Sequence, residues 1–159
     1  MVTDNAHVVL ISTGGTIAAQ ATADGAVPIL SADDLLGSVP AGTADGPMVS
    51  TVDLMSVDSS AMRVRDQFAV VAAVADALAD PSPAVRSHAA EVLVALADPT
   101  RYGVMERQSG EKHAGRAAAV LRSATASEVD GALLLATVSD DRPGLVAAAQ
   151  RLRKERARG

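Results

Sequence analysis

The stretch His7-Val8-Val9-Leu10-Ile11-Ser12-Thr13-Gly14-Gly15-Thr16-Ile17-Ala18 decides the fold of the first half of the chain. Its apolar run ends at a glycine pair, which predicts a strand buried on both faces and followed by a tight turn. A second strand is predicted over 48–57, and helices are predicted over 31–36 and 64–80. The resulting order of strand, helix, strand, helix indicates an α/β fold with a parallel sheet in this half.

Capping residues and low-periodicity segments refine this picture of the first half. Ser31 is suited to the N-cap of the first helix, and Asp33 and Asp34 suit the positive end of its dipole. Residues 18–30 are rich in Ala, Gly and Thr with little periodicity, so we expect a mobile loop there. Residues 41–47 are also expected to form a loop.

The character of the sequence changes at Asp80-Pro81-Ser82-Pro83, where two prolines interrupt any helix. Residues 1–80 carry two cationic and ten acidic side chains, whereas residues 81–159 carry twelve and nine. The change in charge and the two prolines together predict a boundary between an α/β segment, 1–82, and a mainly helical region, 83–159.

Within the second region, helices are expected over 84–98, 103–108, 114–123 and from Pro143 onward. Ala132 to Val138 is a continuous apolar run, and we predict a buried strand there.

Composition excludes several classes of function. The chain has no cysteine, which rules out disulfides, thiolate metal sites and cysteine nucleophiles. No apolar run reaches the roughly 20 residues of a membrane span, and the N-terminus does not resemble a signal peptide, so a cytoplasmic location is expected. A single Phe, a single Tyr and no Trp argue against nucleic-acid binding through aromatic stacking.

Metal and cofactor sites are not indicated by the sequence. His88 and His113 have no carboxylate or histidine partner at ligand spacing, so we expect both at the surface and predict no metal site. The glycine pattern matches neither a P-loop nor a dinucleotide fingerprint, and no cofactor is expected.

The glycine pair and the hydroxyl that follows it form the first candidate site. Gly14 and Gly15 let the backbone turn toward a ligand and leave space for a small substrate beside Thr16. The ends of strands are where open α/β sheets place their chemistry. An ordinary glycine turn is the alternative interpretation.

Asp58, Ser59 and Ser60 form the second candidate site, again at the end of a strand. One carboxylate and two hydroxyls can bind the charged amino and carboxyl groups of a small amino acid. The alternative is that Asp58 or a serine caps the helix that follows.

Taken together, the two segments are similar to the bacterial L-asparaginase/glutaminase family. Thr-Gly-Gly-Thr-Ile-Ala at 13–18 and Asp-Ser-Ser-x-Met at 58–62 follow their strands in that family's order and spacing, and the resemblance extends over residues 7–82. It implies hydrolysis of L-asparagine to L-aspartate and ammonia, with Thr16 as the nucleophile. Gly15, Asp58, Ser59 and Ser60 would then bind the substrate.

The sequence departs from the family pattern in the residues that would activate Thr16. Ala26 stands where family members carry a loop tyrosine, and no His-Gly-Thr-Asp-Thr run occurs anywhere. Lys112 and Lys154 do not match the family's catalytic lysine. One later segment partly resembles the missing region: it consists of Val129-Asp130-Gly131, the predicted strand and Ser139-Asp140. We therefore expect a truncated or degenerate member with little activity alone.

Other interpretations of the second region stay open. Residues 79–86 and 97–101 resemble turns of HEAT-type repeats, 96–101 also resemble a winged-helix repressor helix, and 141–145 resemble the strand–helix turn of ACT domains. A non-catalytic protein that binds a small amino acid or a partner is the second functional hypothesis. Self-association into a homo-oligomer is compatible with both.

Overall fold

A computed structural model describes residues 7–23, 25–38, 46–101, 107–138 and 142–159 of the 159-residue chain. The chain divides into two compact units, which we call the N-terminal unit (Met1–Asp66) and the helical unit (Gln67–Gly159). This division precedes the predicted boundary at residue 82 because α2 (Val64–Asp76) falls almost wholly in the helical unit. The boundary at 82 as a limit of the family segment stays a prediction.

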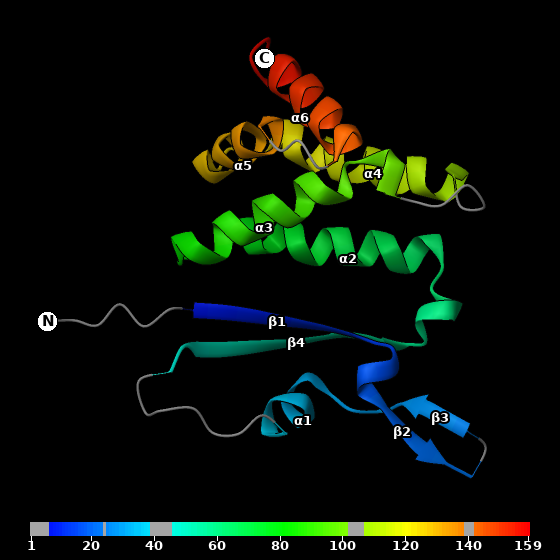
Figure 1. Ribbon diagram of the computed structural model, residues 1–159. Coiled ribbons are helices and arrows are strands. Elements are labelled where there is room, and N and C mark those ends of the chain that lie inside the picture. Colours follow the sequence, from blue (N-terminus) through cyan, green and yellow to red (C-terminus); the bar gives the residue numbers. More distant parts are fainter. Residues whose placement is uncertain (1–6, 24, 39–45, 102–106, 139–141) are drawn as a thin grey trace, which may run out of the picture. The chain divides into compact units, whose positions relative to one another are not determined.

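The N-terminal unit is built on a two-stranded parallel sheet of β1 (His7–Gly14) and β4 (Met48–Val57), as Figure 1 shows. Their register runs from His7 opposite Met48 to Ser12 opposite Asp53, and a bulge then brings Gly14 opposite Val57. The predicted α/β class, the parallel pairing and both strand positions are confirmed.

Burial of β1 on both faces was a wrong prediction. Among the residues of this strand only Ser12 is buried, and Val8 is 45% exposed. In the described part of the chain β1 has a single partner strand, so its apolar side chains lack the cover that a larger parallel sheet would give them.

The first helix, α1 (Ala32–Gly37), begins at the predicted N-cap. Ser31 Oγ accepts the Asp34 backbone N–H at 3.1 Å, and Asp34 Oδ2 accepts the Ser31 N–H at 2.9 Å, which is a reciprocal capping box. The Asp53 carboxylate of β4 accepts the Ala32 N–H at 2.7 Å. The start of α1 is therefore fastened to the sheet.

Residues 18–30 do not form the mobile loop that we expected. After a short 3₁₀ turn, η1 (Thr16–Ala18), they fold into an antiparallel hairpin of β2 (Ala19–Thr22) and β3 (Gly25–Pro28). Gly25 has φ +119°, a conformation open mainly to glycine. An Asp-Gly dipeptide at 24–25 is a hairpin signal that outweighs the weak periodicity. The predicted loop at 41–47 lies largely outside the described residues.

The helical unit contains the rest of α2, then a 3₁₀ turn, η3 (Ala77–Ala79), and further helices that carry most of the core. These are α3 (Pro83–Leu96), α4 (Arg107–Ser123), α5 (Ser127–Thr137) and α6 (Pro143–Arg156), with a 3₁₀ turn, η4 (Pro99–Arg101), after α3. α3 packs against α4, α5 and α6, and α5 also packs against α6 (Figure 1). The predicted helices at 84–98, 114–123 and from Pro143 are confirmed, whereas most of 103–108 lies outside the described residues.

The strand predicted over 132–138 is wrong, because these residues belong to α5 and its C-cap. Val129, Ala132, Leu133 and Ala136 are buried, and this spacing is that of one helical face. The run is built from Ala and Leu, which favour helices, and α3 and α6 supply the surfaces that cover it. The segment that partly resembles the family's second cluster therefore contains a helix in place of the expected strand. Its Ser139-Asp140 pair lies outside the described residues.

Fully buried aliphatic side chains and ion pairs hold the helical unit together. Its largest fully buried side chains are Leu93, Leu121, Leu133, Leu152, Val71 and Val129. Arg86 binds the Glu128 carboxylate at 2.7 Å and donates to the Asp80 carbonyl at 2.8 Å, which joins α3 to the start of α5. Hydrogen bonds from the Arg86 guanidinium lower the pKa of Glu128.

The two histidines of this unit have different environments. His88 is exposed as expected, but His113 is only 3% exposed, so its predicted surface position is wrong. Burial, and secondarily the charge of Arg101, lowers the pKa of the His113 imidazole. No described helix is both long and apolar enough to cross a bilayer.

Candidate active site

The glycine turn after β1 is held against the end of β4. Gly14 and Gly15 have φ values of +88° and +83°, in the left-handed region that favours glycine. The Gly15 N–H donates to the Val57 carbonyl at 2.9 Å. A Cβ on Gly14 would lie 2.5 Å from the Val57 backbone nitrogen, so a side chain there cannot be accommodated without movement. This contact joins the two candidate segments through their backbones.

Gly15 contributes open space rather than a free donor. Its N–H is used by Val57, whereas a Cβ at this position would meet no atom within 4 Å. Gly15 was predicted to help bind the substrate for two reasons, namely a backbone turned toward the ligand and space beside the turn. The geometry supports only the second reason, the space beside the turn.

Thr16 begins η1 directly after this turn. The Ala18 N–H donates to the Gly15 carbonyl at 3.2 Å, and the Ala18 carbonyl accepts the N–H groups of Ile29 at 2.9 Å and Leu30 at 3.0 Å. Ala18 itself is 1% exposed. The backbone that carries Thr16 is thus fixed on both sides, by β4 before it and by the end of the hairpin after it. The Thr16 side chain lies outside the part of the chain that the structure describes.

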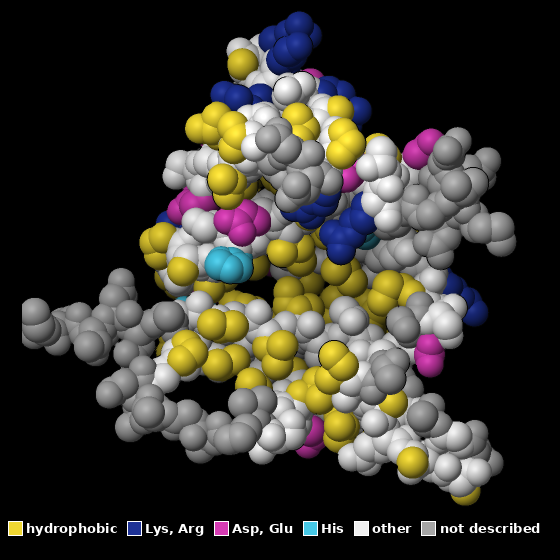
Figure 2. Space-filling model, viewed as in Figure 1, with side chains coloured by type: hydrophobic (Ala, Val, Ile, Leu, Met, Phe, Trp, Pro, Cys, Tyr) yellow, Lys and Arg dark blue, Asp and Glu magenta, His cyan; other side chains and the backbone are white. Residues whose placement is uncertain are grey.

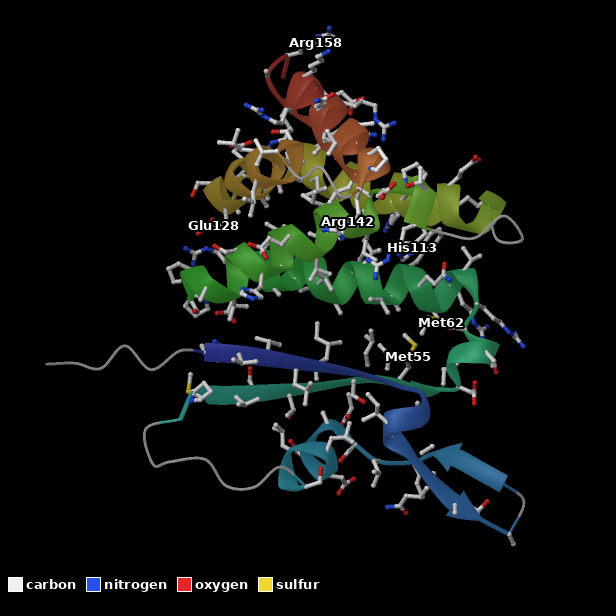
Figure 3. All side chains as sticks on the ribbon, viewed as in Figure 1. Met55, Met62, His113, Glu128, Arg142 and Arg158 are labelled. Atoms are coloured by element: carbon white, nitrogen blue, oxygen red, sulfur yellow. The ribbon has the colours of Figure 1, made fainter. Side chains whose placement is uncertain are left out.

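Asp58 follows Val57 and begins the turn η2 (Ser59–Ala61). Its Oδ1 accepts the Ser60 N–H at 2.8 Å and the Ser60 Oγ hydroxyl at 2.6 Å. The capping interpretation of Asp58 is therefore confirmed, for a 3₁₀ turn rather than for α2. The side chain of Ser59 lies outside the described residues, and Met62, the C-cap of η2, is labelled in Figure 3.

The Asp58 carboxylate is exposed and ionised at neutral pH. The hydrogen bonds from the Ser60 hydroxyl and then from its backbone N–H lower the pKa of Asp58. Only Oδ1 is engaged by Ser60, so Oδ2 keeps its lone pairs for a ligand. An exposed, fixed carboxylate of this kind can bind an ammonium group.

The structure brings the backbones of Thr16 and Asp58 to the same end of the sheet, which their positions after two parallel strands predicted. Ala26 lies in β3, at the position where the family resemblance implies a tyrosine. Sequence reasoning missed the Val57 carbonyl, which anchors the glycine turn. The lengths of β1 and β4 predict that their ends lie close together, but the β-bulge before Gly14 shifts the register and pairs Gly14 with Val57. Strand length was therefore the only feature of the sequence that pointed to this contact.

Metal ligands are not grouped in the described residues: no three His, Asp or Glu side chains there lie close enough to share an ion. Lys112 and Lys154 belong to α4 and α6 of the helical unit. The site as described therefore consists of a glycine turn, the backbone of a threonine, and a carboxylate–hydroxyl pair.

These features define an α/β segment with a glycine turn and a following hydroxyl at the carboxyl ends of parallel strands. The family model described as "Asparaginase, N-terminal" matches residues 7–98, and the chain belongs to the asparaginase family. The match extends past residue 82, where the sequence resemblance ended, and includes α3. Comparisons with curated proteins and with solved structures found no match.

Proposed function

We propose that the chain is an asparaginase-type amidohydrolase segment that acts on L-asparagine through Thr16. The contact between the Gly15 N–H and the Val57 carbonyl carries this proposal, since it joins the nucleophile segment to the Asp58 segment. In the proposed reaction the Thr16 hydroxyl oxygen attacks the side-chain amide carbon. Its proton passes to the departing nitrogen, which leaves as ammonia, and water then hydrolyses the ester to L-aspartate and regenerates Thr16.

The substrate's head group would bind at the second segment. The ionised Asp58 carboxylate suits the α-ammonium group of an amino acid, and Ser59 would supply a hydroxyl for its α-carboxylate. Ser60 would act by holding the Asp58 carboxylate in place, because its hydroxyl donates to Asp58 Oδ1. The open space beside Gly15 would admit the short amide side chain. Glycine at this position is required because any side chain would fill that space.

A threonine hydroxyl is a weak nucleophile and needs a base and an oxyanion stabiliser. The His-Gly-Thr-Asp-Thr run that the family resemblance implies for this role is absent from the sequence. We therefore expect slow turnover by this chain alone. The same observation favours a second candidate function, in which the segment binds a small amino acid without hydrolysing it.

Ammonia release from L-asparagine by the purified chain separates these functions. Thr16→Ala should abolish any release, whereas Thr137→Ala, a threonine in α5 of the helical unit, should leave it unchanged. Equal release by wild type and Thr16→Ala would overturn the catalytic proposal.

Thermal stabilisation by L-aspartate tests the binding function. Aspartate should raise Tm in wild type and Thr16→Ala but much less in Asp58→Asn, because the neutral amide cannot form an ion pair with the ammonium group. Stabilisation without ammonia release would support the binding protein, and the absence of both would contradict both functions.

A further inference from the structure

The helical unit carries an apolar groove that none of the site's chemistry uses. Its walls include Val94 of α3, Leu135 of α5, Val138 after α5, and Leu145 of α6. Leu135 is 60% exposed and Val138 is 68% exposed, although both are large aliphatic side chains. Figure 2 shows hydrophobic side chains gathered on the surface of this unit. Exposed aliphatic side chains beside a groove are typical of an interaction surface.

The groove has an acid at one end and a base at the other. α3 and α5 run in roughly the same direction, because Arg86 near the start of α3 pairs with Glu128 near the start of α5, and Ala95 near the end of α3 lines the groove with Ala136 near the end of α5. Glu91 lines the groove one helical turn before Ala95. Arg142, which is labelled in Figure 3, follows α5 in the chain and lines the groove together with Leu145. The two charges therefore lie toward opposite ends of the apolar stretch.

Both charges are available for a partner. Glu91 and Arg142 are exposed, and neither forms an ion pair or a side-chain hydrogen bond with any residue that the structure describes. By contrast, Arg86 and Arg156 of the same unit are fully engaged with carboxylates and carbonyls. Arg86 and Arg156 are thus paired within the unit, whereas Glu91 and Arg142, at either end of the apolar groove, have no partner among the residues that the structure describes.

Such a surface is complementary to itself. In a two-fold symmetric interface residue i contacts residue j of the partner while j contacts i. A second copy turned by 180° would therefore bring its Arg142 to Glu91 and its Glu91 to Arg142. The protruding Leu135 of each copy would enter the groove of the other. We propose that this groove is the interface of a symmetric dimer of the chain, a property independent of the proposed asparaginase function.

The main test is the oligomeric state of the full chain, measured by sedimentation velocity over a range of concentrations. Wild type should show a monomer–dimer equilibrium. Glu91→Arg and Arg142→Glu should each weaken dimerisation by at least about tenfold, because each places two like-charge pairs in the interface. Glu111→Arg, an exposed charge reversal on α4 outside the groove, should dimerise as wild type does.

Mixing the two variants separates an interface effect from misfolding. An equimolar mixture of Glu91→Arg and Arg142→Glu should dimerise again, since every cross-interface pair is then attractive, and the double variant should dimerise by itself. Leu135→Glu should abolish dimers, whereas Leu134→Glu, on the same helix and 52% exposed but outside the groove, should have a smaller effect. A monomeric wild type at high concentration, or variants that fail to recover on mixing, would overturn the proposal.

Discussion

The two units of this chain differ in where their stability and their chemistry reside. In the described part of the N-terminal unit the buried apolar side chains are Ala18 and Ala32, whereas the helical unit buries four leucines completely. Yet the glycine turn and the Asp58–Ser60 pair both belong to the N-terminal unit. The geometry of the candidate site therefore depends on backbone contacts rather than on a large core.

This difference predicts how each unit responds to substitution. A packed aliphatic core tolerates changes at its surface but loses about 2–5 kcal/mol when a buried leucine is truncated to alanine. A site built from backbone hydrogen bonds and left-handed glycines is instead sensitive to the addition of a single Cβ.

The largest effect is expected from Leu133→Ala in α5. Leu133 is fully buried, so truncation leaves a cavity and should lower the free energy of unfolding by about 2–5 kcal/mol. Urea denaturation followed by far-UV circular dichroism measures this, because the chain has no tryptophan for fluorescence. Leu134→Ala, at a 52% exposed neighbour, should cost much less. Equal losses in the two variants would contradict the packing of α5 described above.

Substitution of the glycine turn tests the other unit. Gly14→Ala and Gly15→Ala both place a side chain in the left-handed region, at a cost of about 1–2 kcal/mol. Only Gly14→Ala also forces a Cβ against the Val57 backbone. It should therefore destabilise the β1–β4 pairing further than Gly15→Ala does.

Amide hydrogen exchange of β1 and β4 is the appropriate measurement, because it reports the opening of this sheet without averaging over the helical unit. The Gly15 amide, which donates to Val57, should exchange faster in Gly14→Ala than in wild type. Unchanged protection of that amide would show that the turn relaxes without losing its contact to β4.

The same contrast explains which features the sequence predicted. β1, β4 and α1 follow from local signals: apolar runs of strand length, and a serine cap with Asp34 at the reciprocal position. The strand proposed at 132–138 failed because a continuous Ala/Leu run has no periodicity of its own. Burial against α3 and α6 then decided in favour of a helix.

The candidate site was predictable in its order along the chain but not in its contacts. Parallel strands carry their following residues to the same sheet edge, which placed Thr16 and Asp58 together. The pairing of Gly14 with Val57 depends on a β-bulge, and no residue type in either strand specifies it. The burial of His113 was likewise not predictable, since it results from the packing of α4 against the rest of the helical unit rather than from a local pattern.

The smallest expected effect is a pH dependence that distinguishes the helical unit from the site. Burial lowers the pKa of His113 below its usual 6.5, so the unfolded chain binds more protons than the folded chain between those two pKa values. The stability that neutral His113 contributes is therefore complete above about pH 6.5 and is lost as pH falls through the folded pKa.

The lowered pKa values of Asp58, Glu128 and Asp130 act in the same direction but only in the range where carboxylates titrate, below their usual values near 4. The unfolding free energy measured by urea denaturation should thus decline as pH falls from 7.5 to 5, in wild type and in His88→Gln, whose substitution alters an exposed side chain. The slope should be smaller in His113→Gln, because the glutamine cannot take up a proton; an identical slope in all three proteins would show that His113 does not govern stability in this range.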